Sequence, residues 1–262
     1  MHFDADILHL LGAFAAAFFA GAINSVAGGG TMISFPVLVA LGLPPIVANA
    51  TNTLGIFPGA IGSLWGFRKE LARIPKLMRW LLIPAVCGSA MGATLLRLTS
   101  ESTFEKIVPW LLLFATTLFI VQTPVQKWLR SAEAAQRPGA RWMTIAVILQ
   151  IAVALYGGYF GAGMSIMMLS ILGLIGMTDI LEMSAMTSLL SLAINGVAGL
   201  LFIFAGLIDW PYVIVMAFGA VIGGYGAAGV ARKIGRTKVR RFVITVGLTI
   251  AIVMFARVAH HR

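Results

Sequence analysis

The sequence predicts an all-α, polytopic integral membrane protein. Of its 262 residues, 60% are hydrophobic and only 11% are charged, and the mean hydropathy is +0.96. So few charged side chains cannot cover the surface of a soluble protein of this size. The hydrophobic segments are continuous rather than alternating, and many approach the length that crosses about 30 Å of hydrocarbon. Continuous apolar segments of this kind predict membrane helices and not the strands of a barrel.

The hydrophobic segments form two sets with similar order and lengths. The first set lies at about 7–23, 31–43, 46–66, 79–97 and 104–122, and the second at about 142–158, 163–176, 181–206, 211–230 and 241–258. We therefore expect a first membrane repeat over residues 1–122, a cytoplasmic basic linker over residues 123–141 and a second membrane repeat over residues 142–262.

Segments 31–43 and 163–176 are too short to cross a membrane comfortably. A helix of that length rises only about 20 Å. We expect each to form a re-entrant hairpin with the segment before it, with glycines at the tip. The inserted units then number about eight, of which about six are full spans and about two are hairpins whose tips meet near the bilayer midplane.

Three local matches between the halves indicate a duplication. They pair Gly28–Ile33 with Gly161–Ile166, Ala50–Thr53 with Ala185–Ser188, and Pro58–Gly62 with Asn195–Gly199. The halves begin on opposite sides of the membrane, because five segments and a cytoplasmic linker separate their starting points. This arrangement predicts an inverted-topology repeat.

The distribution of charge predicts the orientation. Fifteen of the nineteen Lys and Arg residues lie in the connections at 67–79, 123–141 and 231–241. By the positive-inside rule these loops are cytoplasmic, and the N-terminus is then outside. Asp4, Asp6, Glu101, Glu105 and Asp209 fall on the outer side, although Arg257 and Arg262 also end there. The net charge of +10 thus reflects the orientation of a multi-pass membrane protein in contact with lipid, and it does not indicate a nucleic-acid partner.

Several classes of function are disfavoured by what the sequence lacks. No charged residue occurs from Ile7 to Phe67, and between Met143 and Leu207 only Asp179 and Glu182 do. Cation carriers usually place an ionisable group within the membrane. The four histidines lie in the terminal segments without a carboxylate or cysteine cluster, so we expect no metal site. Sequence motifs of intramembrane proteases and ATPases are missing, so we expect neither an enzyme nor a cofactor.

Neutral hydrogen-bonding residues and glycines gather where the helices are predicted to break. The candidate substrate-binding residues are Asn24, Ser25, Gly28, Gly29, Gly30, Thr31, Asn49, Asn52, Thr53, Gly161, Gly163, Ser165, Thr187, Ser188 and Asn195. Helices starting at about Thr31 and Met164 would point their positive N-termini inward, which suits an anion. Helix packing is the alternative role for such small residues. All four asparagines of the chain belong to this set, which favours a binding site for a small anion.

The same residues carry a family resemblance. Six short stretches together resemble the sulfite exporter TauE/SafE family of bacterial membrane proteins. They are Ala20–Thr31, the following Pro36, Ala48–Thr53, Phe67-Arg68-Lys69, Gly158–Ile166 and the late Gly206–Trp210. The resemblance covers nearly the whole chain. It implies secondary transport of a sulfur-containing anion such as sulfite, thiosulfate or an organosulfonate, often in the export direction. The second half departs from the pattern, because the counterpart of Ala50–Thr53 carries no Asn.

The sequence leaves several functions open. The leading hypothesis is an anion transporter that works by alternating access. An anion channel is the alternative within transport, and a non-transporting membrane scaffold or subunit is the alternative from another class. The coupling is also open: uniport, exchange, proton coupling through the substrate's own protonation, and Na⁺ bound by exposed carbonyls all agree with the residues present. The specific anion and the oligomeric state are not encoded in any pattern that we recognise.

Overall fold

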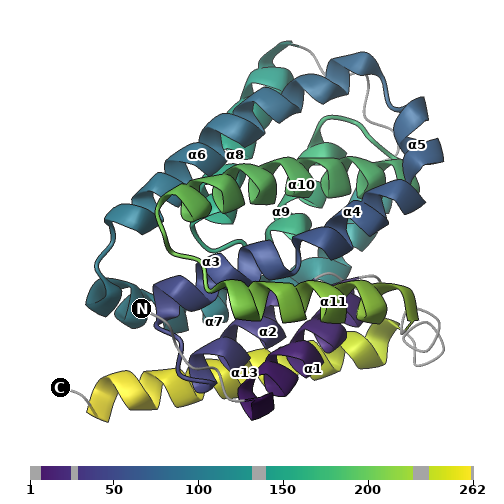
Figure 1. Ribbon diagram of the computed structural model, residues 1–262. Coiled ribbons are helices and arrows are strands. Elements are labelled where there is room, and N and C mark those ends of the chain that lie inside the picture. The colour runs from purple at the N-terminus through teal and green to yellow at the C-terminus, as the bar shows by residue number, and fades with distance from the viewer. Residues whose placement is uncertain (1–6, 25–28, 132–139, 227–235, 261–262) are drawn as a thin grey trace.

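The computed structural model describes residues 7–24, 29–131, 140–226 and 236–260, and every regular element in these ranges is helical (Figure 1). Within the described residues, four helices are long and apolar enough to cross a membrane: Ile7–Asn24, Met78–Leu98, Glu101–Val121 and Ile180–Phe204. The predicted all-α membrane class is confirmed.

Each predicted hydrophobic segment corresponds to helix. The first half contains α1 (Ile7–Asn24), α2 (Thr31–Ala40), α3 (Pro45–Gly55), α4 (Phe57–Gly66), α5 (Arg68–Arg73), the 3₁₀ helix η1 (Lys76–Leu81), α6 (Leu82–Leu98) and α7 (Glu101–Ser131). The second half contains α8 (Ala140–Tyr159), α9 (Met164–Leu174), α10 (Ile180–Phe204), α11 (Trp210–Gly226) and α13 (Arg236–His260).

Two predicted boundaries differ from the structure. Segment 46–66 is not one helix but two, α3 and α4, which are interrupted at Ile56. Pro58 explains the break, because a proline lacks the N–H that a continuous helix would use there. The predicted linker 123–141 is helical up to Ser131, where α7 ends. The Gln, Lys, Leu and Arg residues at the start of the linker favour helix, so α7 continues beyond its apolar part.

The first helix of each half packs along a helix of the other half. Gly21 and Gly223 bring α1 and α11 into backbone contact at Ala220 and Phe18. Gly88 and Gly92 of α6 do the same against Ile151 and Leu155 of α8. Glycines allow such close packing of membrane helices. In Figure 1 α6, α8, α9 and α10 lie together at the top, and α1, α2, α11 and α13 lie at the bottom.

This reciprocal packing of α1 with α11 and of α8 with α6 is what a duplication predicts. The ends of the short helices also match. Gly42 follows α2 and Gly176 follows α9, both with positive φ (+95° and +86°). The N–H of Leu43 bonds to the carbonyl of Leu38 at 3.2 Å, and Met177 bonds to Leu172 at 3.1 Å. These bonds form Schellman caps that end both helices after about three turns. The inversion of the two halves across a membrane stays a prediction.

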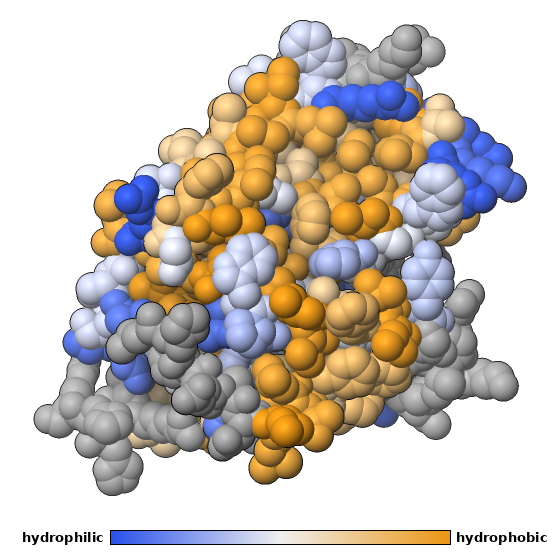
Figure 2. All heavy atoms as spheres, in the orientation of Figure 1, coloured by the Kyte–Doolittle hydropathy of each residue, from blue (hydrophilic) through white to orange (hydrophobic). Residues whose placement is uncertain are grey.

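The outer surface is largely apolar, as expected for contact with lipid. Leu98 of α6, Phe204 of α10 and Phe218 of α11 are 77%, 85% and 65% exposed. Figure 2 shows hydrophobic side chains over most of this face, with hydrophilic residues gathered toward its periphery. A shallow groove along the exposed side of α6, lined by Ala90, Met91, Thr94, Leu95 and Leu98, belongs to this apolar surface. Thr94 supplies the one hydroxyl of the groove, and the rest of its lining is apolar. The clustered polar side chains are buried inside the molecule.

Candidate functional site

The glycine tip of the second half is held by aromatic side chains. Gly161 and Gly163 have φ of +79° and +77°, which turn the chain from α8 into α9. The Tyr156 hydroxyl donates to the carbonyl of Ala162 at 2.6 Å and fixes the turn between them. Gly163 begins α9 without a side-chain cap. The N–H groups of Met164 and Ile166 donate to the carbonyls of Gly161 and Gly163 at 3.3 and 3.1 Å, so the tip itself pairs part of the first turn of α9.

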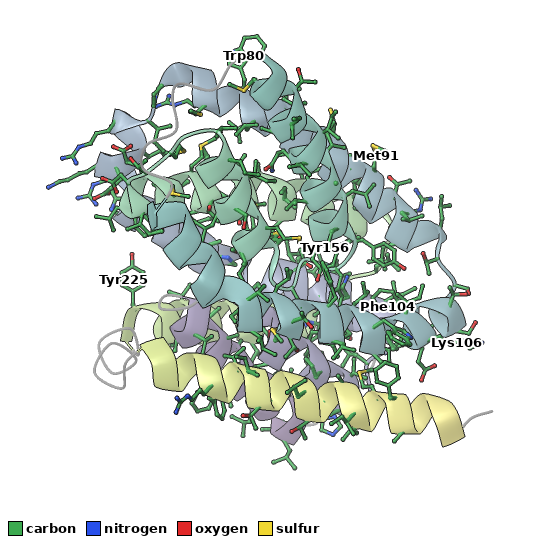
Figure 3. All side chains as sticks on the ribbon, turned by 180° about the vertical axis from the view of Figure 1, so that it is seen from behind. Trp80, Met91, Phe104, Lys106, Tyr156 and Tyr225 are labelled. Atoms are coloured by element: carbon green, nitrogen blue, oxygen red, sulfur yellow. The ribbon has the colours of Figure 1, made fainter. Side chains whose placement is uncertain are left out.

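An aromatic cluster joins this tip to the first half. The Phe160 ring packs edge-on against Phe35 of α2, with ring centroids 5.3 Å apart, and against Phe104 of α7 at 6.4 Å. Phe104 also meets Tyr159 at 5.7 Å. Figure 3 shows Tyr156 near the middle of the molecule. The second tip thus lies in the interior, where the two halves meet.

The tip of the first half is held in a different way. Gly29 has a φ of +90°, and a Cβ at this position would overlap the ring of Phe119 on α7. The backbone of Gly30 lies directly on Ala20 of α1. The side-chain oxygen of Asn24 accepts a hydrogen bond of 2.7 Å from the N–H of Gly30. Asn24, a predicted ligand, therefore uses its amide oxygen to hold the tip.

Both tips contact the same turn of α7. Gly29 touches Phe119, and a Cβ on Gly163 would lie 3.5 Å from Leu118 and 3.6 Å from Ala115. Residues four apart on a helix lie on one face, so the two tips are within about one turn of each other along α7. The expected meeting of the tips agrees with this arrangement.

Helix α3 places two predicted asparagines beside the second tip. Asn49 is 1% exposed, and its Nδ2 donates to the carbonyl of Tyr159 at 3.0 Å. Its Oδ1 is buried without a partner. Asn52, one turn further on the same face, is also 1% exposed, and neither of its side-chain polar atoms has a partner.

The second half contributes Thr187 of α10. Thr187 is 6% exposed, and its hydroxyl is buried without a partner. It is the residue that the sequence match pairs with Asn52. Leaving a buried amide or hydroxyl unpaired costs about 1–3 kcal/mol each. Thr187 lies apart from the two asparagines, because Leu54 of α3 meets Gly199 of α10, which is twelve residues and about 18 Å further along that helix.

The other predicted residues take several roles. Thr53 donates its hydroxyl proton to the carbonyl of Asn49 at 2.9 Å within α3, so that proton is already used. Thr31, Ser165, Ser188 and Asn195 are half-buried. Ser25 and Gly28 lie outside the described residues. Groups of three or more metal-ligating side chains are missing from the described part of the chain, in line with the neutral character of the site.

The chain matches the model of the sulfite exporter TauE/SafE family over residues 13–254, which include both tips and all these polar residues. The protein belongs to this family. The TauE/SafE chain is also similar to three proteins named probable membrane transporters. It is 28% identical to one from Haemophilus influenzae (93% of this chain, 92% of that protein), 29% to one from a Sinorhizobium species (96% and 95%) and 27% to YfcA of Escherichia coli (89% and 84%). No solved structure matches the chain. The protein is therefore a multi-pass membrane transporter.

Sequence reasoning missed two buried polar side chains of this TauE/SafE protein. Gln150 of α8 is 0% exposed, and both of its amide atoms lack a partner. Its signal was an amide in the middle of the apolar segment 142–158. Asp209, in the loop between α10 and α11, keeps one buried carboxylate oxygen without a partner. Its backbone N–H donates to the Thr51 hydroxyl at 3.0 Å, so it adjoins α3 one residue from Asn52.

Substitution of Asp209 by Asn should stabilise the protein in a pH-dependent way. Desolvation raises the pKa of Asp209, and a hydrogen bond from the Tyr212 backbone opposes the rise only in part. The ionised carboxylate therefore disfavours the folded state. The ionised carboxylate lowers the free energy of unfolding once the pH rises above about 3.9, the pKa of an Asp in the unfolded chain. We expect the melting temperature of Asp209→Asn to exceed the wild-type value at pH 7, and the gain to shrink toward pH 4.

Thermal unfolding of the purified protein in detergent between pH 4 and pH 8 measures this effect. The control is Asp179→Asn, because Asp179 is an exposed N-cap that Asn replaces well. A gain of the same size at every pH would show that the charge of Asp209 is not its cause.

Proposed function

We propose that this protein is a secondary transporter that moves a small sulfur-containing anion, such as sulfite, thiosulfate or an organosulfonate, out of the cell by alternating access. The observation that carries the proposal is the carboxamide of Asn52, which is 1% exposed and has no partner for either polar atom. Asn49 and Thr187 add further buried polar atoms without partners. The family description, sulfite exporter, supports the substrate class and the direction.

The chemistry of these groups favours an anion. The side chains are neutral donors, and the N-termini of α2 and α9 add the positive ends of two helix dipoles. In the described part of the chain, helices α1 to α4 contain no Lys or Arg. Within the same part, helices α8 to α11 contain one, Arg141 at the start of α8. Attraction therefore comes from dipoles, which bind an anion without holding it as tightly as a full charge would. A carrier must release its substrate, so moderate binding suits transport.

Burial of the site favours a transporter over a channel. Asn49 and Asn52 are each 1% exposed, so their carboxamides are closed off from both sides in this conformation. A channel needs a continuous wetted path, whereas alternating access includes a closed step. The interrupted pair α3 and α4 supplies the kind of discontinuous helix that lines midplane sites in transporters.

Ligand-dependent thermal stabilisation tests the function directly. The purified protein is melted with sulfite, thiosulfate, sulfate, sulfoacetate, taurine or chloride. A ligand that binds only the folded state at a hundred times its Kd adds about 2.7 kcal/mol of stability. We expect a saturable rise in melting temperature with one class of sulfur anion, and saturable uptake of the same anion into proteoliposomes.

Two outcomes would contradict the proposal. No shift with any sulfur anion would favour a different substrate or a scaffold. Flux that rises linearly with concentration and carries current in proportion to voltage would favour a channel.

A further inference from the structure

Gln150 is the most deeply buried polar residue that the proposed site leaves unexplained. Its side chain is 0% exposed in the middle of α8, and neither Nε2 nor Oε1 has a hydrogen-bond partner. Leu or Met would fill the same space without this cost. An amide kept in such surroundings requires a reason, and water or a ligand is the usual one.

The packing of α8 on α10 shows what Gln150 faces. A Cβ on Gly157 would lie 3.0 Å from Ile194, so these two residues mark one level of the α8–α10 contact. Gly157 adjoins both Met164 and Ile194. The Ser191 hydroxyl donates to the sulfur of Met168 at 3.7 Å, so α9 and α10 run antiparallel. The turn between α8 and α9 also reverses the chain, so α8 and α10 run in the same direction. Figure 1 shows α8, α9 and α10 packed in the same part of the molecule.

Gln150 and Thr187 each lie seven residues before this contact, on α8 and α10 respectively. Seven residues make about two turns and about 10 Å of rise, which returns a side chain to nearly the same face. Gln150 and Thr187 therefore lie at one level of the same interface. Both are buried, and both carry polar atoms without partners. Neither side chain finds its partner within the protein, so a water or a ligand between the two helices would satisfy both.

We propose that the Gln150 amide and the Thr187 hydroxyl form a substrate subsite for a small oxyanion between α8 and α10, about 10 Å along the helices from the Gly157–Ile194 contact that adjoins the second glycine tip. The Gln150 Nε2 donates to the anion, and its Oε1 accepts from a protonated oxygen of the ligand or from a bound water. A subsite with both a donor and an acceptor distinguishes a protonated oxyanion from chloride, which has no proton to give. The subsite rests on the proposed function, since it takes the same class of anion at a second position in the transporter.

The test compares the affinity of purified variants for sodium sulfite and sodium thiosulfate, with sodium chloride as the control salt. Gln150→Met keeps the length of the side chain and removes both polar atoms. We expect its sulfite affinity to fall at least about tenfold, as the loss of a buried hydrogen-bonding partner predicts, while its melting temperature without ligand stays the same or rises. Gln150→Asn, which keeps a shorter amide, should bind with intermediate affinity.

Two threonines provide a matched pair of controls. Thr187→Val removes an unpartnered hydroxyl, whereas Thr116→Val removes a buried one that already donates to the carbonyl of Leu112 at 2.7 Å. We expect Thr187→Val to lose affinity and Thr116→Val to keep it. The double variant Gln150→Met/Thr187→Val should lose less than the product of the two single losses, because both groups bind one ligand.

The outcomes separate this subsite from the general function. If wild-type protein binds no sulfur oxyanion, the proposed function fails. If the wild type binds and Asn52→Ala does not, while Gln150→Met binds as the wild type does, the function stands and the subsite is overturned. A Gln150→Met variant with a lowered melting temperature and unchanged affinity also overturns it, because that result shows a structural water on the amide. Should Gln150→Met fail to fold, Gln150→Asn and Thr187→Val decide the question by the same criterion.

Discussion

Replacement of Asn52 by Ala is expected to lower the affinity for the transported sulfur anion by at least about tenfold, which is about 1.4 kcal/mol of binding free energy. The side chain is 1% exposed, and both of its polar atoms lack partners in the ligand-free protein. Its removal breaks no hydrogen bond, so the usual loss from an emptied core position is offset by the loss of an unpaired buried amide. We therefore expect the melting temperature without ligand to change little. Binding measured by ligand-dependent unfolding and uptake into proteoliposomes gives the two numbers.

The neighbouring residue provides the control. Thr51 is 0% exposed, and its hydroxyl accepts the 3.0 Å hydrogen bond from the Asp209 backbone. Thr51→Val keeps the shape of the side chain but leaves that N–H unpaired, so it should lower stability and leave affinity nearly unchanged. Adjacent positions on α3 would then show opposite effects. Unchanged binding in Asn52→Ala, with normal folding, would remove Asn52 from the site.

Replacement of Gly29 by Val is expected to abolish transport. Gly29 has a φ of +90°, a conformation that a β-branched residue adopts only under strain. A Cβ at this position would also overlap the Phe119 ring on α7. The first tip would have to move away from α7, and with it the N-terminus of α2. Uptake of the sulfur anion should fall to background, while the protein is still inserted and purified in folded form.

Gly42 separates backbone strain from the steric effect. It has nearly the same φ, +95°, but a Cβ there meets no atom within 4 Å. Gly42→Val should therefore cost some stability, on the order of 1–3 kcal/mol, and keep transport.

A second comparison tests the contact between Gly29 and Phe119 itself. Gly29→Ala should be impaired, and Gly29→Ala/Phe119→Ala should recover part of the activity. Full activity in Gly29→Val would mean that the glycine serves packing alone.

The helices are largely predictable because their causes are local. Long apolar segments form helices. Glycines with positive φ, at Gly42 and Gly176, end them, and Pro58 interrupts the helix next to it. The break at Ile56 was missed because its strongest signal, Pro58, lies two residues inside the following helix, where proline is tolerated. The extension of α7 to Ser131 was missed because hydropathy marks where a helix leaves the apolar phase, and not where it ends.

The sequence by itself determined the membrane class, the candidate polar residues and their association with two glycine tips. These follow from composition, from the spacing of hydrophobic segments and from the placement of all four asparagines. Only the tertiary structure decided which polar atoms are already paired. The side-chain oxygen of Asn24 and the hydroxyl of Thr53 are engaged, whereas Asn52 and Thr187 are not. Pairing depends on partners such as the Tyr159 carbonyl, 110 residues from Asn49, and on the packing of α8 against α10, which brings Gln150 to the level of Thr187. Hydrogen bonds are short-ranged and directional, so contacts between residues far apart in the chain are fixed only when the helices pack.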